Sequence, residues 1–161
     1  MSKSISVEEY LEKNGSMTYT NVGVSMLPLL RQGKDLFTVR KKGPERCRVG
    51  DVVLYRRGEQ LVLHRIVSVR ANDYVALGDN CIGREYGLTD DRIIGVMSGF
   101  VRDGREHTVT ERSYRLYSLL WLHTERPRVF LKRGFAWLKR HLRPKEKNRS
   151  GSPSGNRWAN D

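Results

Sequence analysis

Between residues 18 and 110 the sequence is a series of short β-rich runs separated by turn signals. The runs cover 36–40, 51–55, 61–69, 74–77, 93–101 and 108–110, and Gly or Asn-Asp stands beside most of them. Gly95 and Gly99 fall inside one run, where glycine often marks a bulge or a bend. Short strands with frequent turns are typical of an antiparallel barrel or sandwich. We therefore predict a mainly β domain over residues 17–110.

The first 16 residues have the pattern of one short helix. Ser6 can cap it, Glu9 stands three residues later, and Gly15 follows Asn14 as a stop signal. We predict a helical segment within residues 1–16 that docks on the β domain through one apolar face.

The pattern becomes helical again after Glu111. Pro127 can open a helix at its first turn. We predict basic amphipathic helices over residues 111–143 and a disordered tail over 144–161, which is polar and rich in Ser, Gly and Asn.

Most of the positive charge lies in the last third of the chain. Residues 111–161 carry 13 Lys and Arg against 4 Asp and Glu, which is +9 of a net +12. An apolar stripe (Leu131, Phe135, Leu138 and Leu142) accompanies basic pairs at 132–133 and 139–140. This pattern favours an anionic membrane surface over nucleic acid as a partner. The alternative is that these helices pack on the β domain or on a second copy of the chain.

Neither the cysteines nor the apolar runs indicate a metal site or a membrane span. Cys47 and Cys81 form no Cys-x-x-Cys pair and no His cluster accompanies them, so we expect two reduced thiols and no metal or cofactor. No secretory signal opens the chain, and no run approaches the roughly 20 apolar residues of a transmembrane helix. We expect a cytoplasmic protein that associates peripherally with a membrane.

Three polar residues in this arrangement can perform nucleophilic catalysis. Ser25 stands between Gly23 and Pro28, a bent and rigid mount for a nucleophile. A serine hydroxyl needs a base, and the imidazole of His64, in the run 61–69, has a suitable pKa near neutral pH. Asp79 follows a β-rich run and can orient an imidazole. Taken singly, each of the three is as typical of a turn or of a core histidine.

The order of these motifs resembles the signal peptidase and SOS-repressor (LexA-like) serine peptidase superfamily. The matching motifs are Gly-x-Ser-Met-x-Pro-x-Leu from Gly23, Gly-Lys-Asp at 33–35, Val-Gly-Asp-Val-Val at 49–53, Leu-His-Arg-Ile at 63–66, Gly-Asp-Asn at 78–80 and Ile-Ile-Gly-Val at 93–96. The resemblance covers residues 21–101, about half of the chain. It implies a LexA-like β fold, Ser25 as nucleophile and a substrate peptide bound as an added β-strand.

The resemblance also implies a histidine-type site. His64 stands where bacterial signal peptidases and SOS repressors place a lysine, and where the archaeal and endoplasmic-reticulum enzymes place histidine. Asp79 matches the aspartate of the Gly-Asp-Asn box and is our first choice for the third catalytic member. Histidine-type enzymes carry an acidic pair soon after that box, so Asp91 or Asp90 is the alternative. Gly23 replaces a serine that signal peptidases use, which leaves backbone donors for the oxyanion. The family's N-terminal membrane anchor is absent from the sequence.

Three functions are open at this point. The first is a serine endopeptidase that acts on other proteins or peptides. The second is a repressor-type regulator that cleaves itself, which the 24 residues before Ser25 and the lack of an Ala-Gly bond among them disfavour. The third is an inactive binding module with a basic tail for a membrane or nucleic acid. We favour the first.

Overall fold

The computed structural model describes residues 5–141, without the side chains of residues 126 and 136. The described elements, in chain order, are α1 (Val7–Asn14), β1 (Ser16–Thr20), β2 (Leu36–Lys41), β3 (Val52–Arg57), β4 (Gln60–Val69), β5 (Tyr74–Leu77), β6 (Glu85–Leu88), the 3-10 helix η1 (Asp90–Arg92), β7 (Ile93–Arg102), β8 (Arg105–Thr108), α2 (Arg112–His123) and α3 (Glu125–His141).

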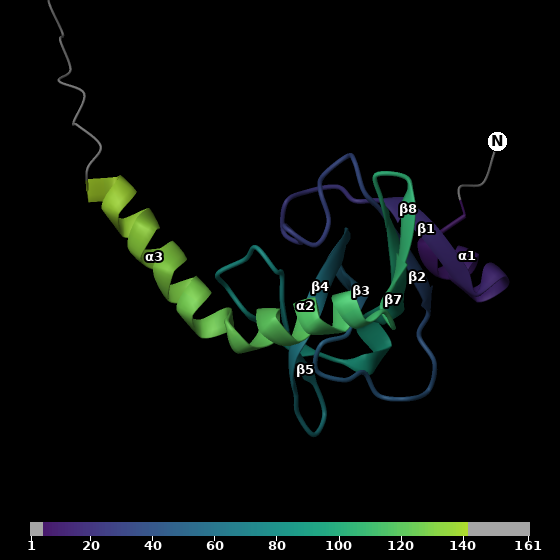
Figure 1. Ribbon diagram of the computed structural model, residues 1–161. Coiled ribbons are helices and arrows are strands. Elements are labelled where there is room, and N and C mark those ends of the chain that lie inside the picture. Colours follow the sequence, from purple (N-terminus) through teal and green to yellow (C-terminus); the bar gives the residue numbers. More distant parts are fainter. Residues whose placement is uncertain (1–4, 142–161) are drawn as a thin grey trace, which may run out of the picture.

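The eight strands form one antiparallel sheet that does not close into a barrel (Figure 1). Its order is β1-β2-β7-β3-β4-β5-β6, and β8 pairs with β7. The mainly β, antiparallel architecture predicted from the sequence is therefore confirmed in its coarse form. β1 and β6 end this order and β8 pairs only with β7, so all three are edge strands. An edge strand presents unpaired backbone groups that can bind another strand.

Both faces of the central strands are buried, because successive side chains of a strand point to opposite faces. Val52 and Leu54 of β3 belong to one apolar cluster with Leu63 of β4, whereas Val53 and Tyr55 belong to a second. Neighbouring residues of β4 are consequently buried on opposite faces of the sheet. This arrangement separates the surroundings of His64 from those of Arg65.

The predicted N-terminal helix is present as α1. The Ser6 side chain accepts from the backbone N–H of Glu9, and the Glu9 side chain accepts from the N–H of Ser6. Gly15 ends the helix in the left-handed conformation, with φ 76°. Leu11 is buried in the sheet's first cluster, so one face of α1 docks as expected.

The bounds of the strands predicted from the sequence agree with those of β2, β3, β4, β5, β7 and β8 to within three residues, and those of β5 agree in full. Two strands, β1 and β6, were not predicted. The β6 sequence Glu-Tyr-Gly-Leu contains a glycine and a charge, which are poor strand formers, and it pairs with only one neighbour. Tertiary pairing with β5 decides its conformation.

The basic helical region predicted after Glu111 forms two helices, α2 and α3, and Pro127 lies in the first turn of α3. Tyr114 and Ser118 of α2 are buried against the β domain. Figure 1 shows α3 continuing from α2 and projecting away from the sheet. Within residues 5–141 no helix combines the length and the apolar character that crossing a membrane requires. Leu142 and the tail predicted over 144–161 lie outside the described residues.

Candidate active site

Ser25 lies in a loop between β1 and β2 that backbone and amide hydrogen bonds hold in place. Asn80 donates its backbone N–H to the Ser25 carbonyl at 2.7 Å and its side-chain amide to the Val24 carbonyl at 3.1 Å. On the other side of the loop, the buried Asn21 side chain donates to the Gly23 carbonyl at 3.1 Å. The Ser25 side chain is half-buried and lines a cleft.

His64 presents one ring nitrogen to a tyrosine and a carboxylate. Because Val53 is the register partner of His64, Tyr55 lies diagonally across from the imidazole. The Tyr55 hydroxyl is 3.1 Å from Nδ1, and Oε1 of Glu85 is 3.2 Å from the same nitrogen. Burial lowers the pKa of His64 below its ordinary value, although Glu85 acts in the opposite direction. The imidazole is therefore held mainly in its neutral form at neutral pH.

Glu85 is the acid that sequence analysis missed. It begins β6, where it pairs in register with Ala76 of β5, and Arg57 holds its carboxylate at 2.8 Å. One signal in the sequence could have found it: Glu85 is the first acidic residue after Gly-Asp-Asn at 78–80, where histidine-type peptidases carry their acidic pair.

Gly78 is the point at which the candidate residues meet. A Cβ atom at Gly78 would lie 2.9 Å from Nε2 of His64, 2.8 Å from the Ser25 carbonyl oxygen and 2.7 Å from Sγ of Cys81. The distance between any two of these atoms is therefore no greater than the sum of their distances to the Gly78 Cβ position. The imidazole consequently turns Nε2 toward the Ser25 backbone, while Nδ1 contacts Glu85.

The Asp79 carboxylate is turned toward Arg65. Nε and one terminal nitrogen of Arg65 each donate to it at 2.8 Å, and Tyr117 donates its hydroxyl at 2.9 Å. Both side chains of the ion pair are 1% exposed. Arg65 also donates to the Gly50 carbonyl and to Ser118 of α2. The carboxylate in contact with His64 is that of Glu85, and a catalytic role of Asp79 stays a prediction.

The alternative acids, Asp90 and Asp91, lie in η1. Asp90 accepts from the Tyr74 hydroxyl at 2.7 Å and forms an ion pair with Lys42 at 3.0 Å. These contacts hold the start of β7, and among the described residues neither aspartate is an ion-pair partner of His64.

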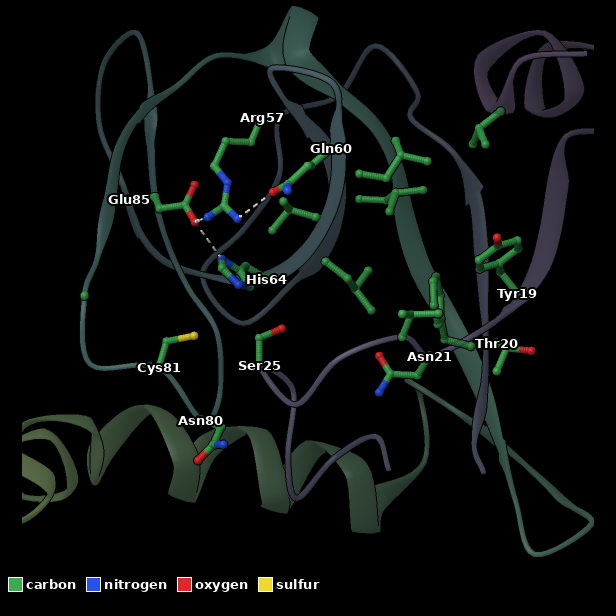
Figure 2. Close-up of a pocket in the computed structure, with 18 of the residues that line it drawn as sticks. Tyr19, Thr20, Asn21, Ser25, Arg57, Gln60, His64, Asn80, Cys81 and Glu85 are labelled. Atoms are coloured by element: carbon green, nitrogen blue, oxygen red, sulfur yellow. Dashed lines mark hydrogen bonds and ion pairs between the residues drawn. The ribbon is translucent and has the colours of Figure 1, made fainter. Parts of the chain in front are cut away.

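The cleft that contains Ser25 and His64 has a volume of about 1060 Å³. Both edges of the open sheet contribute to its walls, Met17, Tyr19 and Thr20 from β1 and Glu85 from β6, and apolar residues such as Phe37 and Leu63 line it as well. Figure 2 shows Ser25, His64 and Cys81 gathered on one side, with Tyr19, Thr20 and Asn21 on the other. This shape suits an extended, partly apolar chain.

Cys81 is a second nucleophilic atom in this cleft. Burial raises the pKa of its thiol, so the protonated and less nucleophilic form is favoured. Cys47 is buried elsewhere, in the second apolar cluster, and both cysteines are unpaired thiols. Within the described residues no group of three or more His, Cys, Asp or Glu side chains is arranged to hold a metal ion.

The chain has no match among family models, curated proteins or solved structures. Its function is therefore inferred from the residues and their geometry.

Replacing Gly78 with alanine should disrupt the cleft. Cys81 can turn away from the new methyl group, but the Ser25 carbonyl is backbone and can yield only if its loop moves. We expect a loss of about 1–3 kcal/mol in the free energy of unfolding, typical of overpacking, and displaced His64 ring resonances in NMR spectra. Gly83→Ala is the matched control, because a methyl group there meets no atom within 4 Å. Equal stability and unchanged His64 resonances in Gly78→Ala would contradict this geometry.

Asp79→Asn should destabilise the protein by about 3–5 kcal/mol, because it leaves the buried Arg65 cation without its counter-charge. Chemical denaturation measures this free energy. The control is Asp103→Asn, which breaks an exposed ion pair with Arg31 and should cost at most about 1 kcal/mol. An Asp79→Asn protein of wild-type stability would contradict this structural role of the ion pair.

Proposed function

We propose that this protein is a serine endopeptidase of the signal peptidase and SOS-repressor type, with Ser25 as nucleophile and His64 as general base. One observation carries the proposal: His64 has a carboxylate at Nδ1 and its Nε2 on the Ser25 side, within a cleft large enough for a peptide. A carboxylate beside Nδ1 favours a proton on that nitrogen, which leaves the lone pair of Nε2 free to accept one.

Glu85 takes the orienting role in this proposal. In a serine triad the acid fixes the tautomer of the imidazole and stabilises the imidazolium that forms. Glu85 has the required contact at Nδ1, and Arg57 fixes its position. Asp79 supports the site indirectly in this proposal. Its ion pair with Arg65 anchors the turn in which Gly78 lies beside His64 and Asn80 binds the Ser25 carbonyl.

The reaction proceeds in two acyl-transfer steps. Ser25 Oγ attacks the carbonyl carbon of the scissile peptide while its proton passes to Nε2, and the imidazolium then protonates the leaving amine. Water then gives a proton to Nε2 and attacks the acyl ester; as the bond to Oγ breaks, the imidazolium returns the proton to Oγ, and the peptide acid leaves. Ser25 Oγ makes no hydrogen bond within residues 5–141. Catalytic hydrogen bonds commonly tighten only when substrate binds.

Backbone amides supply the oxyanion site. Among the hydrogen bonds formed by residues 5–141, none uses the N–H of Ser25 as donor, so this group is available to a developing oxyanion. Gly23 has φ 100°, a conformation that residues with side chains rarely adopt. Serine at this position would be strained, which accounts for the missing side-chain hydroxyl of the signal peptidases.

The substrate that suits this cleft is an extended peptide. β1 and β6 are edge strands that both contribute to the cleft, so a peptide strand placed along either edge can pair with the unused backbone groups. Apolar side chains along the cleft favour a peptide with apolar residues at alternate positions. By resemblance to the superfamily, small residues precede the cleaved bond.

Ser25→Ala and His64→Ala should each abolish covalent labelling by a fluorophosphonate probe and cleavage of a peptide library. Loss of either member of such a pair costs orders of magnitude in rate. Intact mass and peptide mapping locate the label, and library cleavage is followed by mass spectrometry. Ser113→Ala and His123→Ala, on the exposed side of α2, are the matched controls and should behave as wild type.

The strongest alternative to Ser25 as nucleophile is the thiol of Cys81, which lines the same cleft. If Ser25→Ala retains cleavage and Cys81→Ala loses it, the nucleophile is the thiol and the proposal is wrong. If Ser25→Ala and Cys81→Ala both retain cleavage, the activity does not arise in this cleft.

Glu85→Gln should shift the pH profile of kcat/KM to lower pH. In the wild-type protein kcat/KM should fall on acidification with a pKa below that of ordinary histidine, since burial disfavours the imidazolium. Glu85 raises the pKa of His64, so its removal should shift the acid limb to lower pH. The plateau rate should fall by about 10²–10⁴-fold, because the imidazole loses its preferred tautomer. An unchanged profile in Glu85→Gln, with a shifted one in Asp79→Asn, would assign the orienting role to Asp79.

A further inference from the structure

The polar side of α3 is turned toward the β domain. Glu125 accepts two hydrogen bonds of 2.8 Å from Arg84, Arg128 donates to the Asp79 carbonyl at 3.0 Å, and Lys132 donates to the Asn80 side chain at 2.6 Å. These three α3 residues are three and four apart in sequence, so they share one side of the helix. Their contacts fix the rotation of α3 about its own axis.

A second, broad side of α3 is apolar and faces water. At 3.6 residues per turn, this side carries five large apolar residues and runs from Phe135, beside Arg128, round to Trp137, opposite Arg128. They are Phe130, Leu131, Phe135, Trp137 and Leu138, with exposures of 77%, 59%, 73%, 57% and 44%. An amphipathic helix ordinarily turns its apolar stripe to the core of its own domain. Here α3 projects away from the sheet (Figure 1), and its apolar side has no cover within the described part of the chain.

Basic residues border this apolar side. Arg133, Lys139 and Arg140 are exposed. In all, α3 carries six Lys and Arg and a single acid, Glu125, whose charge Arg84 already neutralises. The exposed part of α3 is thus an apolar strip bordered by cations.

We propose that α3 docks on an anionic lipid bilayer, with its apolar side in the interface and its bordering cations among the lipid head groups. Aromatic and aliphatic side chains opposite Lys and Arg are the recognition chemistry of interfacial helices, and Trp137 is a side chain that favours this depth. Docking of two copies through the same strips would bring their cations together, which charge repulsion opposes. An anionic bilayer supplies the counter-charge, and the proposal does not depend on the peptidase activity.

Docking in this orientation couples the membrane to the cleft. Lys132 holds Asn80, and Asn80 in turn holds the Ser25 and Val24 carbonyls. A docked α3 is therefore joined through two side chains to the loop that carries Ser25, and the cleft keeps a fixed orientation relative to the bilayer.

Vesicle flotation of the full chain tests the proposal. Vesicles of phosphatidylcholine alone should leave the protein unbound, whereas vesicles that also contain phosphatidylglycerol should carry it to the top of the gradient at low salt. Raising the salt concentration should weaken this binding, because the cations contribute through screened electrostatics. With bound vesicles the Trp137 fluorescence should shift to shorter wavelength, in a background where the other two tryptophans are replaced by phenylalanine.

Two variants separate the apolar and the charged contributions. Phe135→Glu should weaken binding at least ten-fold without altering thermal unfolding, since the side chain is exposed. Val69→Glu, an exposed apolar position at the end of β4, is the matched control and should bind as wild type. Arg133→Gln and Arg140→Gln should each weaken binding to phosphatidylglycerol vesicles by about five-fold.

Three results would overturn the proposal. The first is the absence of binding to phosphatidylglycerol vesicles at low salt. The second is undiminished binding in Phe135→Glu, which would assign binding to basic residues outside the apolar strip. The third is a dimer in solution that Phe135→Glu converts to a monomer while vesicles remain unbound, which would make a second copy the partner of α3.

Discussion

The buried ion pair between Arg65 and Asp79 is the interaction on which the rest of this structure depends. It joins the middle of β4 to the turn after β5, and its remaining hydrogen bonds extend to Gly50 and to Ser118 of α2. The register explains why the two side chains meet. Arg65 pairs with Leu77, and Asp79 is two residues farther along the same face. Desolvating two charges is costly, so such a pair stabilises the fold only when every remaining donor and acceptor has a partner.

The same two segments serve the cleft with their adjacent residues. In β4, His64 faces the cleft side while Arg65 faces α2, because neighbours in a strand point in opposite directions. In the turn, Gly78 lies against Nε2 of His64, Asp79 anchors the turn to Arg65, and Asn80 holds the Ser25 loop. A serine and a histidine 39 positions apart in sequence thereby contact the same turn. Rigid support of this kind is what a catalytic pair requires, since small displacements cost large factors in rate.

The two basic C-terminal helices contact the β domain in different ways. α2 buries Tyr114 and Ser118 beside Arg65, whereas α3 contacts the domain through polar side chains and leaves its apolar side exposed to water. Exposed apolar surface of this extent generally marks an interaction site. The hydrogen bonds of Arg128 and Lys132 to the carbonyls of Asp79 and Asn80 fix the rotation of α3 about its own axis.

The sequence by itself determined the antiparallel β class, the capped N-terminal helix, a basic helical region after Glu111 and the candidate pair Ser25 and His64, because local periodicity, capping and turn chemistry act over a few residues. Only the tertiary structure decided which acid meets the imidazole. Glu85 reaches Nδ1 of His64 because β6, whose sequence contains a glycine and a charge, pairs with β5. Asp79 meets Arg65 because of the register between β4 and β5. The open edges of the sheet and the outward apolar side of α3 likewise follow from contacts between distant segments, which local patterns do not encode.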